Sequence, residues 1–261
     1  MGSPFVNIMK VKDFRDKHKG QMGFVIGSGP SLRHVDPNDL TPYVTISVNS
    51  SISKFMKTAD YFLADDIGVT HWNYYKIQNR GKGGGFPCFL FKSKLKNEAG
   101  HIDADRIVWF DHKTWYEPSK KKYHKDGLVL TKDEPIIGAR TSVGSALHML
   151  YIMGCDPIIL LGCDCCYEGM NRYYWQFPGE SRCYRLNKEK VFSFPNRGNH
   201  KGSPVDSHSM DFLQYWEALS NSTKKSGVNV INASGGILDS FPRLTLVEVL
   251  SEFGDRIKDD K

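Results

Sequence analysis

The segment DPIILLGCD, residues 156–164, constrains the fold more than any other part of the chain. At its centre, Ile158–Leu161 is an unbroken aliphatic run. Successive side chains of a strand point to opposite faces of a sheet, so apolar groups must cover such a run on both sides. This requirement is typical of a parallel strand inside a sheet that carries helices on both faces. The run therefore predicts an α/β fold.

Other short apolar segments alternate with helical patterns along the chain. Strands are expected at 24–26, 43–52, 59–66, 87–91, 106–110 and 228–234, and helices at 8–19, 139–154, 209–227 and 244–253. Strands spaced in this way, with helices between them, indicate βαβ units. We therefore expect a Rossmann-like, mostly parallel sheet that is flanked by helices. The length of 261 residues suits a single domain over residues 1–261.

Composition and cysteine usage narrow the class of protein. With 40% hydrophobic and 25% charged residues, the chain is neither disordered nor collagen-like. It lacks the run of about 18 apolar residues that a membrane-spanning helix needs, and its start lacks the apolar core of a secretory signal. Among the 6 cysteines, Cys163, Cys165 and Cys166 crowd together without the paired CxxC spacing of a zinc site. We expect reduced thiols and a cytoplasmic protein.

The net charge and the segment 166–207 indicate which class of ligand the protein could bind. The net charge of +6 suits a nucleotide, an anionic glycan or nucleic acid, although it also serves general solubility. Residues 166–207 have no periodic pattern and interleave aromatic side chains with arginines. A stretch of this length without regular structure is usually functional, so we expect a mobile lid that becomes ordered on ligand binding. Aromatic and arginine side chains also stack on unpaired bases.

The turn GSGPS, residues 27–31, follows the first expected strand. A glycine turn between a strand and a helix brings backbone N–H groups close to a phosphate or ribose. Pro30 and the missing third glycine depart from the dinucleotide pattern GxGxxG, and an ordinary tight turn is the alternative. A side chain at Gly29 is expected to block binding with little cost to the fold.

Polar residues stand at the ends of other expected strands and at one helix start. Asn49 follows the second strand, Asp65–Asp66 the third, and Asp164 the strand 156–164. Ligands of open α/β sheets bind outside the carboxyl ends of the strands. These side chains could therefore contact a base, a ribose or Mg²⁺, and Thr141 and Ser142 could contact an anion. The alternative is that they cap the helices that follow.

These features together resemble a family of nucleotide-dependent transferases. The bacterial sialyltransferases that use CMP-sialic acid are similar in GSGPSL (27–32), Asn49, the block 141–164, and Tyr167 with Tyr173. With NVINASGGILDSF (229–241) added, the chain also resembles the wider family of archaeal hydroxymethylpterin pyrophosphokinases and flagellin motility-associated glycosyltransferases. Ser28 stands where the sialyltransferases have asparagine, and one extra residue precedes Tyr167.

The resemblance implies roles for individual residues. In the sialyltransferases the glycine loop and the asparagine hold the nucleotide, and two lid phenols, here Tyr167 and Tyr173, act on the leaving phosphate. The catalytic base is a histidine before the late helix, which fits His208 best and His200 as its competitor. His148 is expected to be packed in a helix. The candidate donor-binding residues are Gly27, Ser28, Gly29, Pro30, Ser31, Asn49, Asp65, Thr141, Ser142 and Asp164.

Three functions follow from this pattern. The first is an inverting glycosyltransferase that needs no cofactor and moves a sugar from a nucleotide-sugar to a hydroxyl of a glycan or of a hydroxymethylated base in DNA. The second is a pterin diphosphokinase that uses ATP and holds Mg²⁺ through Asp65 and Asp66. The third is a nucleotide-binding module without catalysis.

Overall fold

The computed structural model describes most of the chain. It covers residues 9–64, 88–91, 107–111, 116–117, 122–123, 128–137, 141–166, 168, 171, 173–180 and 207–258. Within these residues, no helix is both long enough and apolar enough to cross a membrane.

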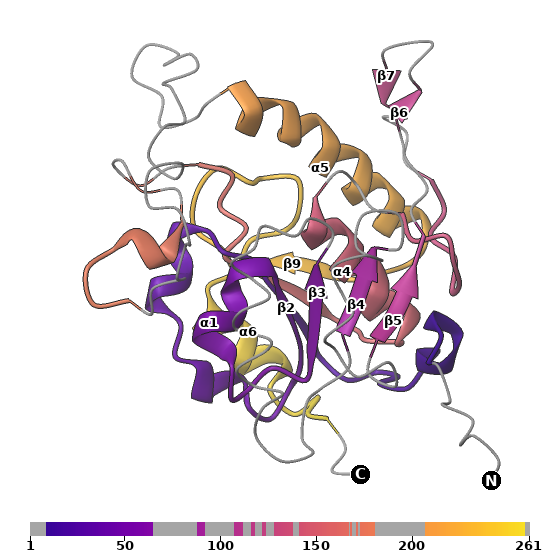
Figure 1. Cartoon of the computed structure of the whole chain (residues 1–261), viewed down its shortest axis with the longest axis horizontal. Coiled ribbons are helices and arrows are strands. Elements are labelled where there is room, and N and C mark those ends of the chain that lie inside the picture. Colours follow the sequence, from indigo (N-terminus) through magenta and orange to yellow (C-terminus); the bar gives the residue numbers. More distant parts are fainter. Residues whose placement is uncertain are drawn as a thin grey trace, which may run out of the picture.

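The centre of the structure is a seven-stranded sheet with the order β5-β4-β3-β2-β1-β8-β9 (Figure 1). Every pair of neighbouring strands in it is parallel. The strands are β1 (Gly23–Ile26), β2 (Val44–Val48), β3 (Tyr61–Ala64), β4 (Cys88–Phe91), β5 (Ile107–Phe110), β8 (Ile158–Leu161) and β9 (Val230–Asn232). The prediction of a Rossmann-like α/β fold with a parallel sheet is confirmed.

The aliphatic run in β8 divides its side chains between two hydrophobic clusters. Ile158 and Leu160 belong to one cluster, and Ile159 and Leu161 belong to the other. The alternation of a strand thus explains why this run has no polar position. Two helices, α4 (Ser142–Ile152) and α5 (Ser207–Lys225), contribute to the first cluster and cover one face of the sheet.

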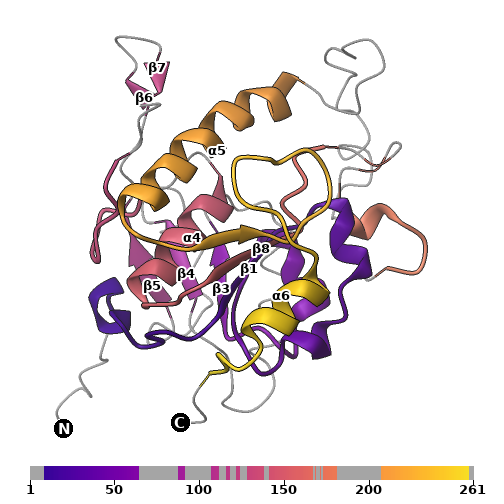
Figure 2. The ribbon, with the colours of Figure 1, turned by 180° about the vertical axis from the view of Figure 1, so that it is seen from behind.

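The opposite face is covered by shorter elements, and Figure 2 shows α6 on that side of the strands, away from α4 and α5. Their buried side chains, among them Leu32, Phe55 and Val249, make up the second cluster together with the sheet. The elements are α1 (Ile52–Phe55), α6 (Leu246–Phe253) and the 3₁₀ helices η2 (Pro30–His34) and η3 (Pro37–Leu40). The helices therefore flank both faces, as expected.

The strand expected at 43–52 ends at Val48, where the 3₁₀ helix η4 (Asn49–Ser51) and then α1 follow. Two further features differ from the sequence-based expectation. The helix expected at 8–19 is only the 3₁₀ helix η1 (Val11–Phe14). Asp16 has φ of 54°, and its N–H donates to the carbonyl of Ile152 at the end of α4, 2.9 Å away. The backbone at Asp16 therefore donates a hydrogen bond to the last residue of α4 instead of continuing a helix. The second feature is an unexpected antiparallel pair, β6 (Tyr116–Glu117) with β7 (Lys122–Tyr123).

Candidate functional site

Five of the predicted site residues lie at the carboxyl ends of the central strands, where the strand order reverses. β1 pairs with β2 on one side and with β8 on the other. In open α/β sheets this reversal is where ligands bind, beyond the carboxyl ends of the strands. The chain leaves β1 through Gly27 and leaves β8 through Gly162. We call Ser28, Ser31, Asn49, Ser142 and Asp164 the strand-end site.

The glycines of the turn pack against the end of β8. The Gly27 N–H donates to the carbonyl of Leu161, and the Gly29 N–H to that of Gly162, each at 2.7 Å. These two N–H groups are therefore engaged within the fold, and the role of the turn in binding a donor stays a prediction. A Cβ atom at position 27 would lie 2.5 Å from the Gly162 carbonyl oxygen, so glycine is needed for this close approach.

Gly29 is enclosed as well. A Cβ atom there would overlap Oδ2 of Asp164 and lie 2.8 Å from the carbonyl oxygen of Gly162. The expectation that a side chain at Gly29 would leave the fold intact is therefore wrong, because it would displace the end of β8. Pro30, the first residue of η2, is also buried and packs within the fold.

Ser28 is the first of the two serines that the turn contributes to the strand-end site. Its hydroxyl is half-buried, accepts a hydrogen bond from Ser50 Oγ at 2.8 Å, and lies 3.5 Å from the Val48 carbonyl. Its own carbonyl accepts the N–H of Tyr174 at 3.1 Å. These bonds tie the turn to the end of β2 and fix where the Ser28 hydroxyl lies.

Asn49 bridges β2 and α4. Its Nδ2 donates to Oγ of Ser142 at 3.1 Å, and its Oδ1 is buried without a hydrogen-bond partner. Asn49 has φ of 53°, a left-handed conformation that asparagine tolerates better than most residues. Thr141 caps α4, since its hydroxyl accepts the Gly144 N–H at 3.0 Å. The capping interpretation thus holds for Thr141, and Ser142 is left to contact Asn49.

Asp164 lies between the glycine turn and the loop after β9. Only 3% of it is exposed, its Oδ2 accepts the Ser31 N–H at 3.2 Å, and its carbonyl accepts the Ile237 N–H at 2.9 Å. Burial raises the pKa of this carboxyl, and hydrogen bonds from Ser31 partly oppose the shift. A Cβ atom on Gly235 would lie 2.8 Å from Oδ1. Asp164 therefore joins the two loops.

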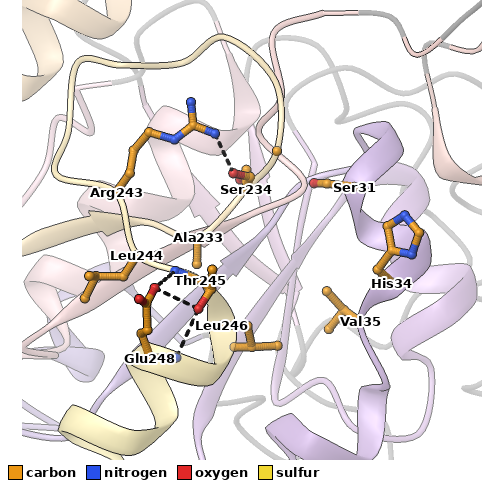
Figure 3. A pocket seen from close by; sticks show the side chains of 11 residues that line it. Ser31, His34, Val35, Ala233, Ser234, Arg243, Leu244, Thr245, Leu246 and Glu248 are labelled. Carbon is orange, nitrogen blue, oxygen red and sulfur yellow. Dashed lines mark hydrogen bonds between the residues drawn. The ribbon is translucent and has the colours of Figure 1, made fainter.

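A pocket of about 400 Å³ opens beside this carboxylate, between η2 and the segment that leads from β9 into α6 (Figure 3). Ser31 belongs to both the pocket and the strand-end site. The pocket was not predicted from the sequence, because its walls come from segments that are about 200 positions apart. Its lining residues are Ser31, His34, Val35, Ala233, Ser234, Gly235, Arg243, Leu244, Thr245, Leu246 and Glu248.

Several predicted residues lie outside the described part of the chain, namely Asp65, Asp66, Tyr167 and His200. His208 is the second residue of α5, but its side chain also lies outside the described part. Among the described residues, no group of three or more His, Cys, Asp or Glu side chains is placed to hold a metal ion. The roles given to these residues stay predictions.

The described part of the expected lid is anchored. Tyr174 is fully buried, and its hydroxyl contacts both the Ser50 carbonyl, at 3.1 Å, and the Ser53 hydroxyl. Arg33 lies over the ring of Phe177 at 4.1 Å, and Lys54 pairs with Glu180 at 3.2 Å. Residues 173–180 are thus fixed to η2 and α1, and the lid remains a prediction for the rest of 166–207.

Of the two tyrosines predicted to act on the leaving phosphate, the structure describes Tyr173. It is half-buried and directly precedes the buried Tyr174. Its ring stacks on that of Trp175 at a centroid distance of 5.3 Å and an interplanar angle of 9°. The stacking limits rotation of the ring, so the position of the hydroxyl is set by the neighbouring side chain.

His148 and two cysteines are packed, as expected. The Nδ1 atom of His148 accepts the Ile137 N–H at 2.8 Å, and Nε2 lies 2.7 Å from the Thr131 carbonyl. Burial lowers the pKa of His148 to about 4, so the ring is neutral near pH 7. Cys155 and Cys163 are buried free thiols whose pKa values burial raises.

Comparison with known proteins adds no relative. No protein-family model matches the chain, and neither does a curated protein or a solved structure. The resemblance to nucleotide-dependent transferases therefore rests on the sequence motifs and stays a prediction.

Proposed function

We propose that the protein is a glycosyltransferase that binds a nucleotide-sugar at the strand-end site and transfers the sugar to a hydroxyl acceptor with inversion. The observation that carries the proposal is the Asn49–Ser142 pair at the reversal of strand order. Ser142 uses only one polar atom of the Asn49 amide, and Oδ1 remains buried without a partner. A buried acceptor of this kind costs about 1–3 kcal/mol unless a ligand donates to it.

The chemistry around this pair suits a nucleotide. A ribose hydroxyl or an amino group of a base would donate to Asn49 Oδ1. The first turn of α4, an 11-residue helix, carries partial positive charge that favours a phosphate nearby. The Ser28 hydroxyl, held by Ser50, adds a further polar contact on the side of β1. A nucleotide would therefore meet groups from β1, β2 and α4 at once.

The transfer itself needs a base and a stabilised leaving group. In the proposed reaction His208 removes the proton of the acceptor hydroxyl, whose oxygen attacks the anomeric carbon. The bond from that carbon to the phosphate oxygen breaks, and the nucleotide leaves with the bonding electrons. Tyr173 and Tyr167 donate hydrogen bonds to the leaving phosphate. The acceptor is a hydroxyl of a glycan or of a hydroxymethylated base in DNA.

The test is nucleotide release from a panel of nucleotide-sugars and from ATP, with and without EDTA. Glycosyl transfer predicts release from a sugar donor that EDTA does not abolish. Release of AMP from ATP that requires Mg²⁺ would instead identify the diphosphokinase, with Asp65 and Asp66 as metal ligands. Tight binding of a nucleotide without any release would identify a module that does not catalyse.

The histidine variants test the mechanism. His208→Ala is expected to lower turnover by about 10²–10⁴-fold, the range for loss of a general base, while donor affinity stays near that of the wild type. His200→Ala is the matched control and should keep its turnover. Loss of turnover in the His200 variant alone would move the base to His200, and normal turnover in both would rule out a histidine base at these two positions.

A further inference from the structure

The pocket beside Asp164 has two walls of different origin. One wall consists of Ser31 and His34 of η2 and of Val35, the residue directly after η2. The other wall comes from the segment between Ala233 and Glu248 (Figure 3). The volume of about 400 Å³ lies within the range of small-molecule sites, roughly 300–1,000 Å³. The pocket is therefore large enough for one ring system with its substituents.

Hydrogen bonds hold the second wall in place. The Arg243 guanidinium donates to the Gly236 carbonyl at 3.0 Å and to the Ser234 carbonyl at 3.2 Å. Glu248 Oε2 accepts both the N–H of Thr245, at 2.7 Å, and its hydroxyl, at 2.8 Å. A site that is fixed before the ligand arrives loses little conformational freedom on binding.

The charges on this wall cancel. Hydrogen bonds from Thr245 lower the pKa of Glu248, so its carboxylate is ionised near pH 7, and Arg243 carries one positive charge. A phosphate would be attracted by Arg243 and repelled by Glu248. A neutral ligand meets no such conflict, and it can use the N–H groups that Arg243 still has and the Oε1 atom of Glu248.

The remaining lining favours a flat ring over a sugar. Val35, Ala233, Leu244 and Leu246 contribute aliphatic side chains to the pocket. A nucleobase has apolar faces that pack on such side chains, and its polar groups lie at the edge. A sugar carries hydroxyls around its whole ring, and hydroxyls buried against aliphatic walls lose hydrogen bonds to water.

We propose that this pocket binds a neutral nucleoside, and that this nucleoside is the acceptor of the transfer. Ser31 connects it to the strand-end site, because Ser31 lines the pocket and its N–H bonds to Asp164. A donor at the strand-end site and a nucleoside in the pocket would then share Ser31 as a neighbouring residue. The acceptor role rests on the proposed function, whereas nucleoside binding does not.

The test is calorimetric titration of the full chain with 2′-deoxycytidine, 5-hydroxymethyl-2′-deoxycytidine and, for comparison, methyl glucoside. Leu246→Trp fills the pocket and is expected to weaken nucleoside binding by about tenfold or more. Val247→Trp is the matched control, because Val247 is the next residue of α6, is 77% exposed and does not line the pocket. Arg243→Gln, which removes the positive charge and the hydrogen bonds to the Gly236 and Ser234 carbonyls, should also weaken binding.

The outcomes separate this inference from the proposed function. Nucleoside binding that Leu246→Trp weakens and Val247→Trp does not, at equal melting temperatures, supports the pocket as the site. Equal binding in both variants, or binding of methyl glucoside in place of the nucleosides, overturns it. A chain that binds nucleotide-sugars and no nucleoside overturns the pocket proposal alone. A chain that binds nucleosides and no nucleotide-sugar keeps the pocket and refutes the transferase.

Discussion

The Nδ2 atom of Asn49 lies 3.1 Å from Oγ of Ser142 and joins the end of β2 to the first residue of α4. The two residues are 93 positions apart in the sequence. Asn49 has a left-handed backbone conformation, and its Oδ1 is buried without a hydrogen-bond partner.

Asn49→Ala should weaken nucleotide binding by about 10–100-fold, because a ligand hydroxyl or amino group loses its buried partner. The left-handed backbone adds a stability cost of about 1–2 kcal/mol for alanine. Ser142→Ala removes the bond without that strain and separates the two effects. Titration with nucleoside monophosphates measures the affinity, and unchanged affinity in both variants would remove Asn49 from the site.

Gly29→Ala should destabilise the fold by about 1–3 kcal/mol, because the new methyl group overlaps the Asp164 carboxylate. Chemical denaturation measures the change. In the double variant with Asp164→Ala the obstructing carboxylate is gone, so the cost of the methyl group should shrink. Strict additivity of the two single changes would mean that the overlap is not what makes glycine necessary here.

His148 should make the fold less stable in acid. Its pKa is about 4 in the folded chain, because burial lowers it, and near 6.5 in the unfolded chain. Between these values the unfolded chain binds a proton that the folded chain does not, so stability falls as the pH drops from about 6.5 to 4. The loss is on the order of 3 kcal/mol at the acid end.

Denaturation of the wild type and of His148→Gln at several pH values checks this slope. The variant should be less stable at pH 8 but should depend less on pH between about 6.5 and 4. His18, whose pKa burial also lowers, keeps its own contribution in both proteins. Parallel slopes would show that the pKa of His148 is the same in the folded and the unfolded chain, against the lowering that burial predicts.

Tyr173 and Tyr174 should respond in opposite ways to removal of the hydroxyl. Tyr174→Phe is expected to lower the free energy of unfolding by about 1–3 kcal/mol, because its buried hydroxyl contacts the Ser50 carbonyl and Ser53. Tyr173→Phe should leave stability nearly unchanged and lower turnover by about 10²-fold through the leaving phosphate. The reverse pattern would exchange the structural and the catalytic tyrosine.

The strands were predictable because each carries its signal locally. Ile158–Leu161 is apolar at every position since both faces of β8 are covered, and the Thr141 cap with the apolar positions after it marks α4. The sheet order then brings the strand ends together by a general rule of α/β folds. Asn49 and Ser142 could be placed at one edge for this reason alone.

The contacts that the sequence did not predict are long-range. Gly27 and Gly29 have the composition of a phosphate-binding loop, but their N–H groups bond to the end of β8, more than 130 positions away. Tyr174 looks like any other aromatic residue of 166–207, and only Ser50, which follows β2, and Ser53 of α1 make it a buried anchor. Asp16 interrupts a helical sequence pattern because its N–H donates to the carbonyl of Ile152 at the end of α4.

Mass analysis of the acceptor tests the central claim most directly. The chain is incubated with a nucleotide-sugar panel and with 5-hydroxymethyl-2′-deoxycytidine, DNA containing this base, or a glycan. The proposal predicts an acceptor heavier by one sugar less one water, one nucleotide released for each product, and loss of both in His208→Ala. An acceptor that stays unmodified with every donor, or that gains a diphosphate from ATP, would contradict it.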